Sequence, residues 1–298
     1  MNTKGHLLKK RLREWLCYLP LSDRQYTEVV YRHYFQRPLR LNPPVTFTEK
    51  IQWLKLFGSG EKLSSLVDKY AVREYVTSRV GAQYLNKLYG VYTHEFEIDF
   101  DSLPEKFVLK ATHGSGWNIF CRDKRQFDSK AARRQLRKWL GMNYYRACRE
   151  PNYKHVPPRI VCEHFLEDEK QKSLLDYKFF CFHGRVQIVQ VDFDRFTNHT
   201  RNMYDRDWAL CPFMFLYPNN PLKLKRPENF EKMIEVAEAL ADGIPFVRVD
   251  LYNVASEILF GELTFTPGSG LEPFSPVEWD YRVGAYLQLP DCRKPRES

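Results

Sequence analysis

Four polar side chains near the C-terminus occupy alternate positions in two neighbouring segments. They are Arg248, Asp250, Glu262 and Thr264. The two segments, residues 246–252 and 260–265, are rich in β-branched and aromatic residues, which favours strands. Alternate side chains of a strand share a face. A turn centred on Ser256 would place Asp250 opposite Glu262 and bring the four side chains to one face of a hairpin.

Two neighbouring carboxylates repel each other, and one tends to stay protonated unless a cation lies between them. Mg²⁺ binds a few carboxylates together with phosphate oxygens, and an arginine can bind a phosphate oxygen directly. We therefore predict that Asp250 and Glu262 hold Mg²⁺ beside a nucleotide phosphate. A half-exposed hairpin with a structural ion pair remains the alternative explanation.

Further upstream, a strand that ends in a lysine runs into a glycine-containing loop. The lysine is Lys110, and the loop contains His113, Gly114, Ser115 and Gly116. Backbone N–H groups of such a loop can approach phosphate oxygens, and the lysine adds a positive charge. The loop lacks the Gly-Lys-Ser/Thr of a Walker A sequence, so an ordinary turn that binds no phosphate remains the alternative interpretation. His113 could contact substrate or transfer a proton, or could simply orient the loop.

Two further segments place charged residues on predicted strands. Residues 159–166 read as a short apolar strand that ends near Glu163, and residues 173–182 as a strand with Asp176 and Lys178 on one face. In chain order, the sequence offers a lysine before a glycine loop, a strand-end glutamate, and then Asp-x-Lys, Arg-x-Asp and Glu-x-Thr strands. This order resembles that of the ATP-grasp superfamily.

Individual motifs sharpen the resemblance. Residues 262–268 resemble the Glu-x-Asn-x-x-Pro-Gly signature of D-alanine–D-alanine ligases, with Thr264 in the place of Asn. Asp176-Tyr177-Lys178 resembles the Asp-x-Arg element of tubulin–tyrosine ligases, with Lys in the place of Arg. From about residue 30 onward, six motifs together resemble the TupA-like ATP-grasp family, which is associated with bacterial cell-surface polysaccharide and teichuronopeptide synthesis. They are residues 46–53, 68–70, 110–114, 176–179, 248–252 and 260–265.

The resemblance implies an α+β fold, with two lobes and ATP between them. We expect a helical N-terminal region over residues 1–100, a smaller lobe with the glycine loop over 101–172, and a C-terminal lobe with the metal site over 173–298.

The resemblance also implies roles for single residues. Triphosphate binding falls to Lys69, Lys110 and Lys178, and the glycine loop, residues 114–116, serves as the lid. Glu163 would face adenine or ribose, and Asp176 a ribose hydroxyl or a neighbouring lysine. One or two Mg²⁺ ions, or Mn²⁺ in their place, would bind Asp250 and Glu262, with Thr264 as a further ligand. Arg248 would stabilise the transferring γ-phosphoryl group, assisted by Lys178.

The reaction implied is carboxylate–amine ligation. A substrate carboxylate attacks the γ-phosphate of ATP, and an amine or amino acid then attacks the acyl phosphate. The carboxylate would belong to a uronic acid or peptide of a surface glycan. A phosphotransferase acting on a sugar hydroxyl uses the same site, and a non-catalytic nucleotide-binding factor is a third alternative. The complete set of Lys110, Arg248, Asp250 and Glu262 argues against the third.

Composition narrows the partners and the compartment. Lys and Arg exceed Asp and Glu by 46 − 37 = +9, which suits an acidic or lipid-linked glycan acceptor. We expect no nucleic-acid partner, because no nucleic-acid-binding motif is present. The seven cysteines form no Cys-x-x-Cys pair, which is typical of cytoplasmic proteins. We found no secretory signal and no apolar run long enough to span a membrane.

Helical patterns cover much of the remaining chain. Residues 6–36 read as largely helical with a break at Pro20, and their basic N-terminal part could touch the inner face of the membrane or pack on its own domain. Further helices are predicted over about 46–57, 68–79, 129–148 and 227–242. The proline-containing stretch 211–221 predicts a surface loop over the site or an acceptor-binding insertion.

Overall fold

The computed structural model describes residues 16–17, 19–58, 60–167, 174–194 and 198–290. The basic cluster at residues 9–13 lies outside these ranges, so the proposed membrane contact of this segment stays a prediction. Among the described residues, none of the helices is both long and apolar enough to cross a bilayer.

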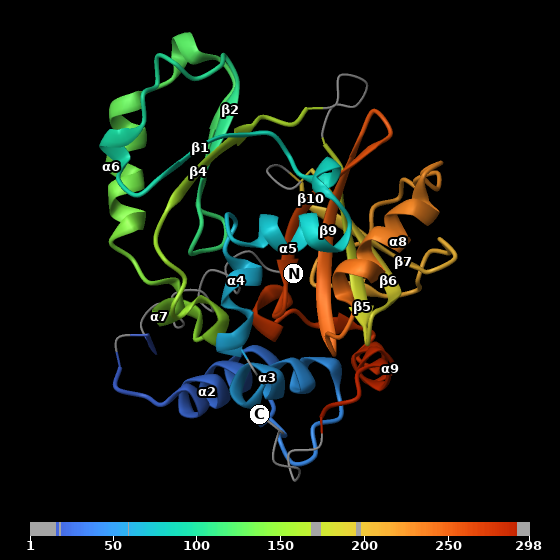
Figure 1. Cartoon of the computed structure of the whole chain (residues 1–298). Coiled ribbons are helices and arrows are strands. Elements are labelled where there is room, and N and C mark those ends of the chain that lie inside the picture. The colour runs from blue at the N-terminus through green and yellow to red at the C-terminus, as the bar shows by residue number, and fades with distance from the viewer. Residues whose placement is uncertain (1–15, 18, 59, 168–173, 195–197, 291–298) are drawn as a thin grey trace.

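The centre of the molecule is a five-stranded antiparallel sheet with strand order β10-β9-β5-β6-β7 (Figure 1). Its strands are β5 (Asp176–Phe182), β6 (Arg185–Phe193), β7 (Thr200–Asp205), β9 (Phe246–Val254) and β10 (Glu257–Thr264). Helix α8 (Phe230–Ala241) packs on one face, where Val249, Leu251 and Leu263 join its buried side chains in one core. The predicted helix over 227–242 is therefore present, although it is shorter. At one end, the opposite face carries aromatic side chains, including Phe180 and Phe246.

The hairpin β9–β10 has the predicted register at the site but not at its tip. Asp250 pairs with Glu262, and Arg248 with Thr264, so their side chains share a face. The turn consists of Ala255 and Ser256, both with positive φ, and a bulge at Gly261 shifts the pairing by one residue. A Cβ on Gly261 would lie 3.0 Å from the carbonyl oxygen of Asp250. A side chain here would crowd the backbone of Asp250, so glycine suits the bulge.

A second sheet, with strand order β1-β4-β2-β3, forms the smaller lobe at the upper left of Figure 1. Its strands are β1 (Leu88–Tyr92), β2 (Phe107–Ala111), β3 (Asn118–Cys121) and β4 (Ile160–His164). Helix α6 (Ser129–Leu140) covers it by burying Ala132 and Leu136 in the core of the lobe. The sheet thus starts at Leu88, inside the range that the sequence assigned to the N-terminal region.

The single helix predicted over 129–148 is wrong. The structure has α6 and then a separate helix α7 (Tyr144–Cys148), whose N-cap Asn143 accepts a hydrogen bond from the backbone of Tyr145. Gly141 ends the first helix, and the capping asparagine starts the second. The amphipathic pattern continued across this break and concealed it.

Helices α2 (Asp23–Phe35), α3 (Phe47–Phe57) and α9 (Glu278–Tyr286) form the base of the molecule (Figure 1). Thr46 caps α3 through a capping box with Glu49. The Asp280 carboxylate accepts hydrogen bonds from the backbone N–H and the hydroxyl of Thr48, at 2.9 and 2.7 Å. The motif at residues 46–53 therefore joins the N-terminal and C-terminal helices.

The remaining elements are short. Helices α4 (Ser64–Val67) and α5 (Val72–Arg79) lead to the smaller lobe, and β8 (Met214–Phe215) pairs with β11 (Phe274–Ser275). The predicted helix over 68–79 starts only at Val72. Asp68 precedes it and accepts hydrogen bonds from the backbone of Tyr70 and Ala71. The 3-10 helices are Gly60–Leu63, Ala82–Tyr84, Glu95–Glu97, Lys124–Gln126, Pro151–Tyr153 and Pro267–Gly270. Mixed helices and antiparallel sheets confirm the α+β class.

Candidate nucleotide-binding and active site

A cavity of about 230 Å³ lies between the two sheets and is lined by residues of both. Nine of the predicted site residues line it: Lys69, Lys110, Ser115, Gly116, Glu163, Asp176, Lys178, Asp250 and Glu262. Arg248 and Thr264 lie directly beside them on the hairpin, whereas His113 and Gly114 are buried behind the loop. Residues up to 193 positions apart in sequence thus converge on one cavity.

The larger sheet contributes a buried row of alternating charges. Asp250 accepts hydrogen bonds from Arg248 Nε and Nη2, at 2.6 and 2.7 Å. Lys178 donates to both Asp250 and Asp176. Burial alone would raise the pKa of Asp250, but the charges of Arg248 and Lys178 hold it below its usual value. Asp250 is therefore an ionised carboxylate inside the protein.

Glu262 is the accessible member of this group. Its side chain is 39% exposed, whereas that of Asp250 is 3% exposed. Its Oε1 accepts long hydrogen bonds from the Thr264 hydroxyl at 3.3 Å and from Arg248 Nη2 at 3.4 Å. The carboxylate therefore keeps capacity for a ligand that enters from the cavity.

The donor set suits a metal ion that shares phosphate oxygens. Asp250, Glu262 and Thr264 bring carboxylate and hydroxyl oxygens to adjacent positions of the hairpin, and such oxygens are the ligands that Mg²⁺ prefers. The described residues contain no group of three or more His, Cys, Asp and Glu side chains arranged to hold a metal by themselves. The hairpin thus fits a metal held partly by nucleotide, and not one held in an all-protein cage.

The smaller lobe supplies positive charge from the opposite wall. Lys110 Nζ donates to Glu163 Oε2 at 2.7 Å, and Arg73 Nη1 lies 3.4 Å from Glu163 Oε1. Glu163 thus lies against two cations. Arg73 was missed by the sequence, where it reads only as one more charged residue of a helix.

Lys69 connects the helical region to the glycine loop. Its ammonium group donates to the carbonyl oxygen of Gly114 at 2.5 Å. Burial lowers the pKa of Lys69, and the charge of Lys110 acts in the same direction, whereas Glu262 opposes it. The side chain therefore reaches the region between the loop and the hairpin carboxylate.

Most of the glycine loop is anchored from behind. His113 is buried, and its Nε2 lies 2.8 Å from the carbonyl oxygen of Trp139, while the Trp117 ring stacks on Trp139 with centroids 6.1 Å apart. A Cβ on Gly114 would lie 2.6 Å from the Trp117 ring. Burial lowers the pKa of His113, which keeps its ring neutral. This placement favours the loop-orienting role of His113.

The cavity also has apolar lining residues, which the sequence motifs did not reveal. They include Val108, Phe165, Leu166, Leu174 and Phe260. Phe165 and Leu166 directly follow strand β4, where the chain leaves the smaller lobe. An apolar pair directly after the strand-end glutamate was the signal in the sequence. A cavity lined by both apolar and charged groups suits a ligand with an aromatic base and a polyphosphate.

Two sheets around a charged cavity agree with an ATP-grasp fold, and the comparison with protein families identifies the branch. A model of the TupA-like ATP-grasp family matches residues 49–288. The chain belongs to the TupA-like ATP-grasp family. This confirms the resemblance found in the six spaced motifs.

Two solved structures illustrate the similarity in fold. D-alanine–D-alanine ligase from Bacillus anthracis is 13% identical with a TM-score of 0.42, over 68% of this chain and 58% of that chain. A RimK-domain ATP-grasp protein from Sphaerobacter thermophilus is 11% identical with a TM-score of 0.39, over 82% and 71%. The chain thus spans little more than half the length of the first enzyme, and the likeness concerns the fold alone. A search of curated protein sequences gave no match.

Proposed function

We propose that this protein is an ATP- and Mg²⁺-dependent carboxylate–amine ligase that works through an acyl phosphate. It attaches an amino acid or similar amine to a carboxylate of a uronic acid or peptide in a bacterial surface polysaccharide. The observation that carries the proposal is the cavity itself, where Lys110 and Lys69 face the row of Lys178, Asp250 and Glu262. ATP-grasp family membership supports the ATP-dependent ligase chemistry.

We propose one orientation for ATP in this cavity. The adenine lies near Phe165 and Leu174, and the triphosphate lies between the lysines of the two walls, all of which line the cavity. Asp250, Glu262 and Thr264 hold the metal, for which Mn²⁺ is a chemical alternative. When bound, the metal neutralises the negative charge of the phosphate groups.

Arg248 is the residue proposed to meet charge on the γ-phosphoryl group. Asp250 holds its guanidinium by two hydrogen bonds, which fixes the plane of the fork. Its Nη2 also donates to Thr264 Oγ1 at 3.0 Å, and thereby lies among the metal-binding oxygens. A donor that is already oriented costs no reorganisation when charge develops.

Lys178 is proposed to assist in the same step. The side chain bridges Asp176 and Asp250 and is 4% exposed. We propose that Asp176 orients this ammonium group, while a direct contact with the ribose remains its second role. The glycine loop then covers the phosphates with Ser115 and Gly116, its exposed tip, and excludes water that would hydrolyse an acyl phosphate.

The acceptor is proposed to be an acidic or lipid-linked glycan, and the location the cytoplasm, at or near the inner face of the membrane. The chain has 46 basic and 37 acidic residues, and this excess of positive charge supports an anionic partner. On α6, Lys130, Arg134 and Lys138 are exposed. Arg137 instead pairs with Glu95 at 2.6 Å, which gives it a structural role in the smaller lobe.

Mass spectrometry of reaction products tests the proposal. Purified protein is incubated with Mg-ATP, a mixture of amino acids, and acceptors that carry glucuronate or galacturonate. The expected products are an amide, ADP and free phosphate. ADP together with a phosphorylated sugar would show that the protein is a phosphotransferase and not a ligase. Intact ATP with every acceptor would contradict both functions.

A further inference from the structure

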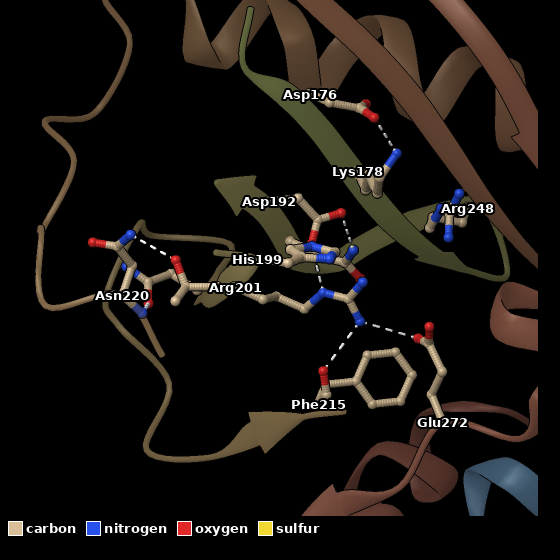
Figure 2. A network of polar contacts seen from close by, with 12 residues as sticks. Asp176, Lys178, Asp192, His199, Arg201, Phe215, Asn220, Arg248 and Glu272 are labelled. Carbon is tan, nitrogen blue, oxygen red and sulfur yellow. Dashed lines mark hydrogen bonds and ion pairs between the residues drawn. The ribbon is translucent and has the colours of Figure 1, made fainter. Parts of the chain in front are cut away.

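The polar face of the large sheet continues beyond the proposed metal site, onto strands β6 and β7. Asp176 on β5 pairs with Asp192 on β6, and Asp192 pairs with Arg201 on β7. Figure 2 shows these side chains together with Lys178 and Arg248 on the same sheet. Nothing in the proposed nucleotide site uses Asp192, Arg201 or the neighbouring His199.

These residues form a hydrogen-bonded network around one buried carboxylate. Asp192 Oδ1 accepts from Arg201 Nε at 2.6 Å and lies 3.0 Å from His199 Nε2. Asp192 Oδ2 accepts from the Gln190 amide at 2.9 Å. Arg201 is held further by Glu272 at 3.0 Å. The carboxylate is thus fixed on both oxygens.

The ring of His199 is oriented with one nitrogen turned away from this network. A hydrogen bond to an ionised carboxylate places the proton on Nε2 and leaves the lone pair on Nδ1. The ring stacks on Tyr217 with centroids 3.7 Å apart, and the side chain is 16% exposed. The ring contacts Asp192 through Nε2.

Electrostatics link this network to the proposed reaction centre. Burial alone would raise the pKa of Asp192, but the His199 hydrogen bond and the charges of Arg201 and Lys178 hold it well below its usual value. The charge of Arg248 likewise acts on Arg201. The strand pairing agrees, because Lys178 lies opposite Gln190 on one side and Asp250 on the other. Asp192 therefore stays ionised beside His199 and close to the proposed reaction centre.

We infer that His199, oriented by Asp192, is the proton acceptor for the attacking amine of the second substrate. The inference rests on the proposed ligase function. Carboxylate, oriented imidazole and nucleophile form the usual sequence for activating a nucleophile that is protonated at neutral pH.

Nδ1 of His199 takes one proton from the ammonium group, and the freed lone pair of the nitrogen forms a C–N bond to the acyl carbon. The C–O bond to the phosphoryl group breaks, and phosphate leaves with the electron pair. A second proton passes from the nitrogen to the departing phosphate, which leaves an amide and hydrogen phosphate.

The surroundings of His199 can accept hydrogen bonds from an ammonium group. Asp192 and Glu272 supply two carboxylates, and the cations nearby are Arg201, Lys178 and Arg248. Among the described residues, the buried Oε1 atom of Gln190 has no hydrogen-bond partner, so it can accept a hydrogen bond from an ammonium group. The ring of Tyr217 packs on the imidazole.

The test separates the two halves of the reaction by means of two nucleophiles. Protein, Mg-ATP and either D-glucuronate or D-galacturonate are incubated with hydroxylamine or with a mixture of the proteinogenic amino acids. Hydroxylamine is uncharged at neutral pH and traps an acyl phosphate as a hydroxamate without a general base. An amino acid must first lose a proton. The variant is His199→Gln, and the matched control is His155→Gln, an exposed histidine that lies 3.8 Å from a carboxylate outside the cavity.

We expect His199→Gln to form hydroxamate within about twofold of wild type and to form amide about 10²–10⁴-fold more slowly, the range for loss of a general base. His155→Gln should match wild type in both reactions. Added imidazole should restore part of the amide formation to His199→Ala, a result that a purely structural role does not produce.

Two outcomes overturn the inference while leaving the ligase intact. One is an undiminished rate of amide formation by His199→Gln, and the other is an equal loss of hydroxamate and amide. If wild type forms neither product with either carboxylate, the ligase function fails, and the inference fails with it.

Discussion

Two of the buried clusters of carboxylates and arginine in the described part of the chain include residues of the family motifs, Glu49 in one and Asp250 in the other. One joins α3 to α9, where Glu49 and Asp280 bind Arg37, at 2.6 and 3.4 Å. The other lies on the large sheet, where Asp250 binds Arg248 and Lys178. The residue types and the depth of burial are similar, but the surroundings differ.

In the α3–α9 cluster, protein groups use up the hydrogen-bonding capacity. Glu49 accepts from the backbone of Val45 and Thr46, and Asp280 from Thr48. On the sheet, the row ends at the half-exposed Glu262, which lines the cavity. Access to a cavity, and not the presence of buried charge, separates the candidate active site from a structural clamp. This difference predicts loss of turnover at one cluster and loss of stability at the other.

The largest effect is expected from Arg248→Ala and Glu262→Gln. Either change removes a charged group from the proposed phosphate and metal site, so turnover should fall at least about 10²–10³-fold, while nucleotide binding changes less. Steady-state kinetics with the products identified above measure this loss. Glu257→Gln, an exposed position on the same strand, is the control. Normal turnover by Glu262→Gln would assign the hairpin a structural role.

Asp280→Ala should act in the opposite way. It removes the acceptor of Thr48 and the partner of Arg37, which should lower the free energy of unfolding by about 2–3 kcal/mol. This is less than for a fully buried pair, because Arg37 is partly exposed. Urea unfolding measures the change, and activity per folded molecule should be unaltered. A loss of turnover at unchanged stability would instead show that the α3–α9 cluster also takes part in the reaction.

Val249→Ala examines the two faces of the catalytic strand. Val249 is fully buried against the α8 side of the sheet, so the truncation should lower the free energy of unfolding by about 1–3 kcal/mol. Turnover per folded molecule should persist. Were Val249→Ala to abolish turnover while Glu262→Gln merely destabilised the fold, the assignment of the two faces would be inverted.

The smallest effect concerns the pH dependence of the α3–α9 cluster. Burial raises the pKa of Asp280 above its usual value, so the folded state binds this proton more tightly than the unfolded state. Its contribution to stability is complete below the unfolded pKa of about 3.9 and is lost as the pH rises through the folded pKa. The stability of wild type relative to Asp280→Asn should therefore fall across this window. If the difference in unfolding free energy between wild type and Asp280→Asn grows with pH instead, the pKa of Asp280 is lowered by folding and not raised.

The sequence predicted the parts of the site that strands and turns align locally. Alternation on 246–252 and 260–265 was enough to bring Arg248, Asp250, Glu262 and Thr264 to one face, because strand side chains alternate strictly. The bulge at Gly261 was not predicted, although the register at Asp250 depends on it. The turn consists of Ala255 and Ser256, shorter than a loop centred on Ser256, and the bulge restores the pairing of Asp250 with Glu262.

Contacts between distant segments could not be predicted in the same way. The placement of Arg73 against Glu163 and of His199 against Asp192 depends on how strands of different hairpins pair. Nor did the motif at residues 46–53 indicate whether it served the site or the scaffold, because the partner Asp280 lies over 200 residues away. Spacing along the chain predicts which side chains share a face of a strand or helix, but it does not predict which distant residues are neighbours in the folded structure.

Metal-dependent binding of ATP in the cavity is the central claim, and thermal unfolding tests it directly. Mg-ATP should raise the melting temperature of wild type by linkage to the folded state. EDTA should remove most of that increase, and Lys110→Ala should show a smaller one, because it removes a positive charge from the triphosphate wall. An equal increase with and without divalent metal, or no increase with Mg-ATP, would contradict the account.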